Sequence, residues 1–225
     1  MNCFLHGAVG HYKDWSGIIG SIDSTVGFAP NLYRYTNYEL NKSARLVNKF
    51  NEEAETLIGY SMGGRLALHC LLESNSKWKK AVIISAHTGL KSEAEKLNRV
   101  KSDIKWADSA IKNWDSFIQS WESQSIFQNS QPIKRGYSLS HHKRNIASSF
   151  QNWSLGNQNF LEPLLKKIRI PVLWIVGDLD FKFLEIADRA CKILPNAELV
   201  KLNSTGHRVP WDNPTQTLNT INSFI

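Results

Sequence analysis

Cysteine is scarce in this sequence, with only Cys3, Cys70 and Cys191 among 225 residues. The three lie far apart, and no two of them form a CxxC pair. An odd number of scattered cysteines argues against a disulfide scaffold and against a zinc finger. Because such thiols are normally kept reduced inside cells, we expect a cytoplasmic protein.

Long apolar runs are also missing. No stretch approaches the roughly 18 apolar residues of a membrane helix, so we expect no membrane insertion. The first residues, MNCFLHG, have neither the basic start nor the long apolar segment of a signal peptide. The composition, 42% hydrophobic and 21% charged, excludes a disordered or collagen-like chain and allows a sizeable core.

Acidic residues are outnumbered, and the net charge is +7. Residues 91–167 hold 12 Lys and Arg against 7 Asp and Glu, an excess of +5, whereas the rest of the chain holds 15 against 13. A basic surface suits nucleic acid or a small polyanionic substrate. No nucleic-acid-binding module is recognisable, so we expect the small polyanionic substrate and no nucleic-acid partner. Nothing in the sequence indicates an oligomeric state.

Short apolar runs alternate with helical patterns along most of the chain. Such alternation predicts βαβ units and a parallel sheet. The helices are predicted over Gly64–Leu72, over Phe183–Ile193 and from Pro214 onward. The predicted strands are Asn2–His6, Asn31–Tyr35, Glu55–Tyr60, Ala81–Ala86, Pro171–Gly177 and Ala197–Leu202.

Residues 88–165 interrupt this alternation. They contain no convincing strand, a helical pattern throughout, and four of the eight tryptophans. We interpret this segment as a helical cap, or lid, inserted into a core formed by residues 1–87 and 166–225. We expect the cap to cover the carboxyl ends of the strands and to supply positive charge there.

The segment Gly59-Tyr60-Ser61-Met62-Gly63 fits the pattern G-x-S-x-G between a predicted strand and a predicted helix. This context is typical of a nucleophile elbow, a strained turn that exposes a serine at the helix N-terminus. A serine needs an imidazole as its base, and the imidazole needs a carboxylate to orient it.

The carboxylate and the imidazole are found after the last two strands. Asp180 follows the strand that ends at Gly177, and His207 follows the strand that ends at Leu202, at the strand ends where sites in parallel sheets form. Asp178 is a rival acid, and we favour Asp180 because it lies further into its loop.

Two backbone N–H groups are candidates for an oxyanion hole. The turn His6-Gly7-Ala8 follows the first strand, so the N–H groups of Ala8 and Met62 are the expected donors. The side chain of His6 is expected to be structural. The pair His141-His142 lacks companion ligands, and we expect no metal and no other cofactor.

Six stretches resemble the 2-succinyl-6-hydroxy-2,4-cyclohexadiene-1-carboxylate synthases of menaquinone and phylloquinone biosynthesis, a branch of the α/β-hydrolase superfamily. The resemblance covers nearly the whole chain. The stretches are FLHGAVGHYKDW (Phe4–Trp15), GYSMGGRLAL (Gly59–Leu68), SAHTGL (Ser85–Leu90), RVKSDIKWA (Arg99–Ala107), GDLDFKF (Gly177–Phe183) and GHRVPWDNP (Gly206–Pro214).

The resemblance implies a lyase with an α/β-hydrolase fold. Members of this family take a ring proton from a cyclohexene tricarboxylate and release pyruvate. The implied proton acceptor is the serine of a triad formed by Ser61, Asp180 and His207. The implied substrate-binding residues are Tyr60, Arg65, Arg99 and Trp121.

The chain departs from the family pattern at three places. Spacing does not fix a further carboxylate-binding arginine of the insertion, for which Arg135 and Arg144 are candidates. The usual Pro-Gly-His-Gly stretch is replaced by Tyr35-Thr36-Asn37-Tyr38. The chain begins at what is normally the third strand, which implies a trimmed, wholly parallel sheet of about six strands.

Two other classes of function remain. A carboxylic-ester or thioester hydrolase would use the same triad for nucleophilic catalysis, and only Arg65 and Arg99 favour the lyase over it. A non-catalytic binding protein on this fold is disfavoured by the complete order of serine, acid and histidine.

Overall fold

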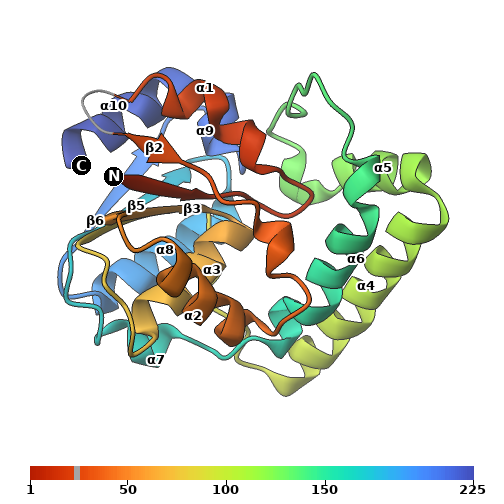
Figure 1. Cartoon of the computed structure of the whole chain (residues 1–225), viewed down its shortest axis with the longest axis horizontal. Coiled ribbons are helices and arrows are strands. Elements are labelled where there is room, and N and C mark those ends of the chain that lie inside the picture. The colour runs from red at the N-terminus through yellow and green to blue at the C-terminus, as the bar shows by residue number, and fades with distance from the viewer. Residues whose placement is uncertain (23–25) are drawn as a thin grey trace.

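A single six-stranded sheet forms the centre of the computed structural model, which describes residues 1–22 and 26–225 (Figure 1). All strand pairs are parallel, in the order β2-β1-β3-β4-β5-β6. The strands are β1 (Asn2–Leu5), β2 (Gly27–Phe28), β3 (Thr56–Tyr60), β4 (Lys80–Ile84), β5 (Val172–Gly177) and β6 (Ala197–Leu202).

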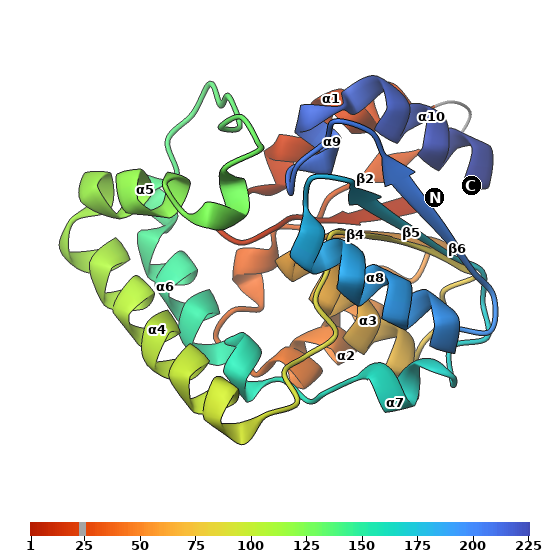
Figure 2. The ribbon, with the colours of Figure 1, turned by 180° about the vertical axis from the view of Figure 1, so that it is seen from behind.

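Helices cover both faces of this sheet. On one face lie α1 (Ser16–Ile19), α9 (Val209–Asp212) and α10 (Pro214–Phe224) (Figure 1). On the other face lie α2 (Leu40–Phe50), α3 (Met62–Leu72), α7 (Glu162–Leu165) and α8 (Phe181–Ile193) (Figure 2). This three-layer arrangement is the α/β-hydrolase fold that the sequence predicts.

Alternating side chains of the strands build two separate cores. Leu57, Ile83 and Trp174 face the layer of α2, α3 and α8, whereas Ile58 and Ile175 face α1 and α10. Successive side chains of a strand point to opposite faces, so a strand covered on both sides must be apolar throughout. This is why the central strands could be recognised as short continuous apolar runs.

One of the six predicted strands is wrong. Asn31–Tyr35 contains the 3₁₀-helix η2 (Leu32–Arg34), because the Asn31 side chain caps that turn by accepting a hydrogen bond from the N–H of Tyr33 at 3.1 Å. The strand beside β1 is instead β2, whose two residues pair with Asn2 and Cys3. Two residues carry no periodicity, so sequence patterns could not find this strand.

The segment between β4 and β5 is helical, as expected. Its main helices are α4 (Glu93–Lys112), α5 (Trp114–Glu122) and α6 (Lys143–Asn152), with the short helices η3 (Ser125–Phe127), η4 (Ser140–His142) and η5 (Leu155–Asn157). Helices α4, α5 and α6 gather beyond the carboxyl ends of the strands in both views (Figures 1 and 2). Their apolar side chains, including Phe117, Ile146 and Phe150, form a third cluster together with Val9 and Tyr33 of the core.

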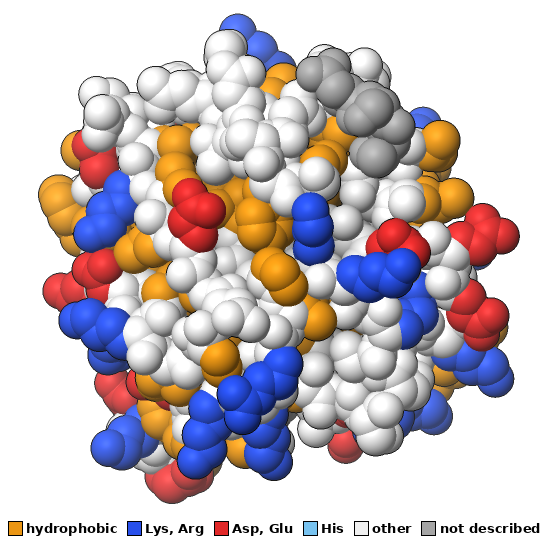
Figure 3. Space-filling view, turned by 90° about the vertical axis from the view of Figure 1, so that its left-hand side faces the viewer, with side chains coloured by type: hydrophobic (Ala, Val, Ile, Leu, Met, Phe, Trp, Pro, Cys, Tyr) orange, Lys and Arg blue, Asp and Glu red, His pale blue; other side chains and the backbone are white. Residues whose placement is uncertain are grey.

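The opposite side of the molecule, where the strands begin, carries charges of both signs. Basic and acidic side chains both occur there, with hydrophobic side chains between them (Figure 3). This face is therefore not the uniformly basic surface that nucleic acid would favour. None of the helices in the described ranges has the length and hydropathy of a membrane span.

Candidate active site

Ser61 occupies the sharp turn between β3 and α3. Its backbone has φ = 52° and ψ = −112°, a conformation that is uncommon for a residue other than glycine. Its N–H donates to the carbonyl of Ile84 at 2.8 Å. A Cβ atom at Gly59 would lie 2.5 Å from the carbonyl oxygen of Gly63, and one at Gly63 would lie 2.2 Å from that of Leu5. The glycines of the motif are needed because backbone fills the space beside them.

His207 connects Ser61 to a carboxylate. Its Nε2 atom lies 3.1 Å from Ser61 Oγ, and its Nδ1 atom lies 2.7 Å from Asp180 Oδ2. A proton on Nδ1 would be donated to the carboxylate, leaving Nε2 free to accept the serine proton. Both His207 and Asp180 are buried. The arrangement can therefore convert Ser61 into a base or a nucleophile.

Asp178 has a different partner. Its Oδ1 atom accepts a hydrogen bond from the backbone N–H of Thr205 at 3.1 Å, within the loop that carries His207. Asp180 is the N-cap residue of α8, which begins at Phe181 and not at Phe183 as predicted. Of the two candidate acids, the one that contacts His207 is Asp180.

A cavity of about 330 Å³ opens above Ser61. Eight of the nine predicted site residues line it, and the ninth, Asp180, lies behind His207. Helices of the cap form much of its wall, so Arg99 and Trp121 lie at the same cavity as Ser61. The predicted residues at the cavity are Ala8, Tyr60, Ser61, Met62, Arg65, Arg99, Trp121 and His207.

The charged residues that line this cavity are all basic. They are Arg65 on α3, Arg99 on α4 and Lys182 on α8, and no Asp or Glu is among the described lining residues. A cavity with several cations and aromatic walls suits an organic polyanion.

Arg65 is buried and has neutral partners. Its guanidinium donates to Gln158 Oε1 at 3.0 Å and to the carbonyl oxygen of Trp153 at 2.9 Å. In the described part of the chain, no carboxylate oxygen lies within 4.0 Å of it. Burial lowers the pKa of Arg65 to about 9, so the side chain remains charged at neutral pH. A buried cation held by neutral groups favours an anionic ligand.

Arg99 is partly committed to Asp103. Its Nε atom lies 2.8 and 2.9 Å from the two oxygens of Asp103, one helical turn further along α4. Asp103 is itself buried and also accepts a hydrogen bond from Ser154. This ion pair engages only the Nε atom of the guanidinium and orients the Arg99 side chain, which is 39% exposed.

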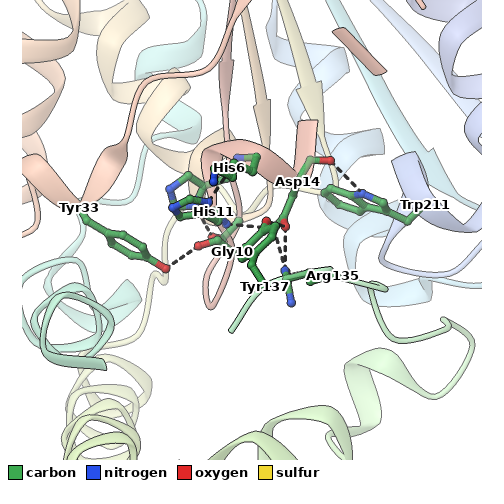
Figure 4. Close-up of polar contacts among 10 residues, drawn as sticks. His6, Gly10, His11, Asp14, Tyr33, Arg135, Tyr137 and Trp211 are labelled. Atoms are coloured by element: carbon green, nitrogen blue, oxygen red, sulfur yellow. Dashed lines mark hydrogen bonds and ion pairs between the residues drawn. The ribbon is translucent and has the colours of Figure 1, made fainter. Parts of the chain in front are cut away.

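Neither candidate for the further insertion arginine lines the cavity. Arg144 is exposed on α6. Arg135 makes a bidentate ion pair with Asp14, at 2.7 and 2.8 Å (Figure 4). Asp14 lies 121 positions earlier, in the segment that follows β1. The ion pair directs the Arg135 side chain toward Asp14. Sequence spacing could not reveal this contact between distant residues.

Three other residues that line the cavity were not predicted from the sequence: Lys182, Phe183 and His87. Lys182 lies in the stretch GDLDFKF, which supported the resemblance, so a signal was present there. Phe183 packs on His207 with 4.5 Å between ring centroids. His87 accepts a hydrogen bond from the N–H of Gly89 at 3.0 Å, and burial lowers its pKa to about 3, so it is neutral.

Asp14 ties the loop that contains Ala8 to the cap. Its carboxylate is 1% exposed and accepts hydrogen bonds from Arg135, from the hydroxyl of Tyr137 at 2.5 Å and from the N–H of His11 at 2.9 Å (Figure 4). The side chain of Trp211 donates to the Asp14 carbonyl from α9 at 3.4 Å. Three parts of the chain therefore converge on this one residue.

We expect Asp14→Asn to lower the free energy of unfolding by about 2–4 kcal/mol, because Arg135 would keep its partly buried charge without an anionic partner. Urea titration at neutral pH measures the change. The matched control is Asp108→Asn on α4, where the carboxylate is exposed, with an expected change of about 0.5 kcal/mol or less. Equal losses in the two variants would contradict a role for the Asp14 ion pair in stability.

The fold and the turn at Ser61 define the class of protein. The chain belongs to the α/β-hydrolase fold family, whose sequence profile matches residues 20–214. A curated 2-succinyl-6-hydroxy-2,4-cyclohexadiene-1-carboxylate synthase of Pectobacterium atrosepticum is 26% identical, over 98% of this chain and 92% of that protein.

Two further proteins are similar to this chain over nearly its whole length. A Bacillus subtilis protein that carries the same synthase name provisionally is 27% identical, over 98% of this chain and 88% of that protein. The solved structure of MenH from S. aureus superposes with a TM-score of 0.88 and 22% identity, covering 99% of this chain and 92% of that one. At that identity, the structural match demonstrates the shared fold.

Proposed function

We propose that this protein is a 2-succinyl-6-hydroxy-2,4-cyclohexadiene-1-carboxylate synthase, a lyase that needs no metal or other cofactor. Its substrate would be 2-succinyl-5-enolpyruvyl-6-hydroxy-3-cyclohexene-1-carboxylate, a small polyanion in the cytoplasm. The observation that carries the proposal is the contact between Ser61 and His207 at a cavity whose charged lining residues are Arg65, Arg99 and Lys182. The names of the relatives support the same activity.

The reaction would begin with removal of a ring proton. Ser61, activated by His207, takes the proton from the ring carbon next to the succinyl ketone, and His207 receives the proton of the hydroxyl. The electron pair shifts through the ring double bond, and the bond from the ring to the enolpyruvyl oxygen breaks. The leaving enolpyruvate then takes up the proton held by His207 and becomes pyruvate, which returns Ser61 and His207 to their starting states.

The remaining predicted residues would hold the substrate for this step. The N–H groups of Ala8 and Met62 face the negative charge that develops on the ketone oxygen during proton removal. Arg65 and Arg99 bind carboxylates, and Tyr60 and Trp121 confine the ring. Residues 88–165 act as a lid that keeps water from weakening the contacts between arginine and carboxylate.

The alternative is a carboxylic-ester or thioester hydrolase. The same Ser61–His207–Asp180 geometry would serve nucleophilic attack on an acyl carbon. The test is to incubate the protein with the cyclohexene substrate and, separately, with a nitrophenyl ester. Pyruvate release much faster than ester cleavage supports the lyase, and ester cleavage without pyruvate release overturns it in favour of the hydrolase.

We expect Arg65→Lys and Arg99→Lys each to lower kcat/KM for pyruvate release by about 10- to 100-fold, because a point charge cannot reproduce a bidentate contact with carboxylate. Steady-state kinetics measures the effect. The control is Arg45→Lys, which alters an exposed ion pair with Glu73. If both cavity variants behave like Arg45→Lys, the substrate does not bind through these guanidinium groups.

A further inference from the structure

Lys182 occupies a boundary between two cavities. It lies in the first turn of α8, two residues after Asp180. Together with His87 it lines both the cavity above Ser61 and a second cavity of about 550 Å³. The residue as a whole is exposed, so Lys182 lies at the solvent-facing side of the cavity above Ser61.

The ammonium group of Lys182 has no ion-pair partner in the part of the chain that the structure describes: no carboxylate oxygen lies within 4.0 Å of its Nζ atom. The acidic groups that act on it from a greater distance are Glu95 and Asp180. Partial burial and the neighbouring charge of Arg99 lower the pKa of Lys182. An anion between Lys182 and Arg99 would relieve the repulsion between these two cations.

The three cations differ in depth. Arg65 is buried and fixed by two hydrogen bonds at the inner wall, and Arg99 is partly exposed and fixed by Asp103. Lys182 is the most exposed of the three and stands at the boundary with the outer cavity. Basic groups are thus available from the buried end of the site to its opening, as a ligand with several separated carboxylates requires.

We propose that Lys182 binds the substrate carboxylate that lies nearest the opening of the site, leaving the two deeper carboxylates to Arg65 and Arg99. This assignment rests on the proposed function, because it requires a substrate with three carboxylates. Lys182 would select for the outer carboxylate and would not take part in proton transfer.

A contact of this kind has a characteristic kinetic signature. An exposed ammonium that binds an unreacting carboxylate stabilises the bound substrate and the transition state equally, so its loss raises KM and leaves kcat nearly unchanged. We expect Lys182→Met to raise KM by about tenfold, a value reduced from that of a buried charged contact by exposure to solvent. We expect kcat to change less than about twofold.

The experiment compares Lys182→Met with Lys182→Arg and with Lys192→Met, an exposed lysine in the last turn of the same helix. Pyruvate release gives KM and kcat for each variant at low and high salt. The Lys182→Arg variant is expected to restore most of the affinity, and Lys192→Met to match wild type. The KM of Lys182→Met should also depend less on salt than that of wild type.

Calorimetric titration of the cyclohexene substrate into Ser61→Ala protein, with and without Lys182→Met, separates binding from turnover. Binding weakened about tenfold by Lys182→Met supports the proposal. Equal affinities, or a loss of kcat with KM unchanged, overturn it while leaving the lyase activity of the wild type intact. Absence of pyruvate release by the wild type would instead overturn the proposed function itself.

Discussion

Replacement of Ser61 with alanine is expected to lower kcat/KM for pyruvate release by at least about 10³-fold, since it removes the oxygen that we propose as the acceptor of the ring proton. The hydroxyl lies 3.1 Å from His207 Nε2, which is hydrogen-bond distance before substrate is bound. Without it, the proton that the serine was to accept has no hydroxyl between it and His207 Nε2. The residual rate would come from substrate binding and the oxyanion hole alone.

The same substitution is expected to leave the fold intact. Ser61 keeps a Cβ atom in the variant, and its side chain packs into no apolar core, so the free energy of unfolding should change by about 1 kcal/mol or less. Circular dichroism and urea titration check this. Ser204→Ala is a matched control, because Ser204 also has a positive φ of 52° but lies outside the cavity.

Activity of the Ser61→Ala protein within about tenfold of wild type would move the chemistry to another residue. The His207→Ala variant then tests whether the imidazole removes the ring proton without the serine. If it does, His207→Ala loses activity and Ser61→Ala does not. If Ser204→Ala lost as much activity as Ser61→Ala, the effect would come from changing a serine with positive φ and not from removing the Ser61 hydroxyl.

The predictable part of the site is the part that is encoded locally. The elbow needs only a strand, Gly59, Ser61, Gly63 and a helix within a short stretch, and each of these features leaves its own mark on the sequence. The acid and the histidine likewise follow strands that are recognisable as apolar runs. Parallel strands place their carboxyl ends together, so three distant stretches could be brought to one edge of the sheet by topology alone.

The unpredictable part depends on contacts between distant residues. Arg135 is aimed by Asp14, which lies 121 positions earlier, and nothing near Arg135 in the sequence indicates that partner. The 3₁₀ turn at Leu32–Arg34 is stabilised partly by the hydroxyl of Tyr33, which donates to the carbonyl of Gly10. Short apolar segments of this kind follow tertiary contacts more than intrinsic propensity.

Asp180→Asn is expected to lower kcat for pyruvate release by up to about 10⁴-fold, the loss typical of a serine triad whose carboxylate becomes an amide. Asp180 Oδ2 lies 2.7 Å from His207 Nδ1 and is buried with it, and a carboxylate that can only accept favours the tautomer with the ring proton on Nδ1. The amide N–H₂ of asparagine can instead donate to Nδ1. The imidazole proton would then occupy Nε2, where it blocks transfer from Ser61.

Asp178→Asn is the matched control in the same loop, because it makes the same chemical change two residues away. Asp178 only accepts a hydrogen bond from the N–H of Thr205, and the amide oxygen of asparagine can accept that bond equally well. We therefore expect Asp178→Asn to retain kcat within about threefold, measured beside Asp180→Asn in one pyruvate assay. If Asp178→Asn were the more damaging change, Asp180 would not be the acid on which His207 depends. Similar small losses in both variants would mean that the tautomer of His207 is fixed without a carboxylate, and that the proposed proton transfer through Ser61 does not require one.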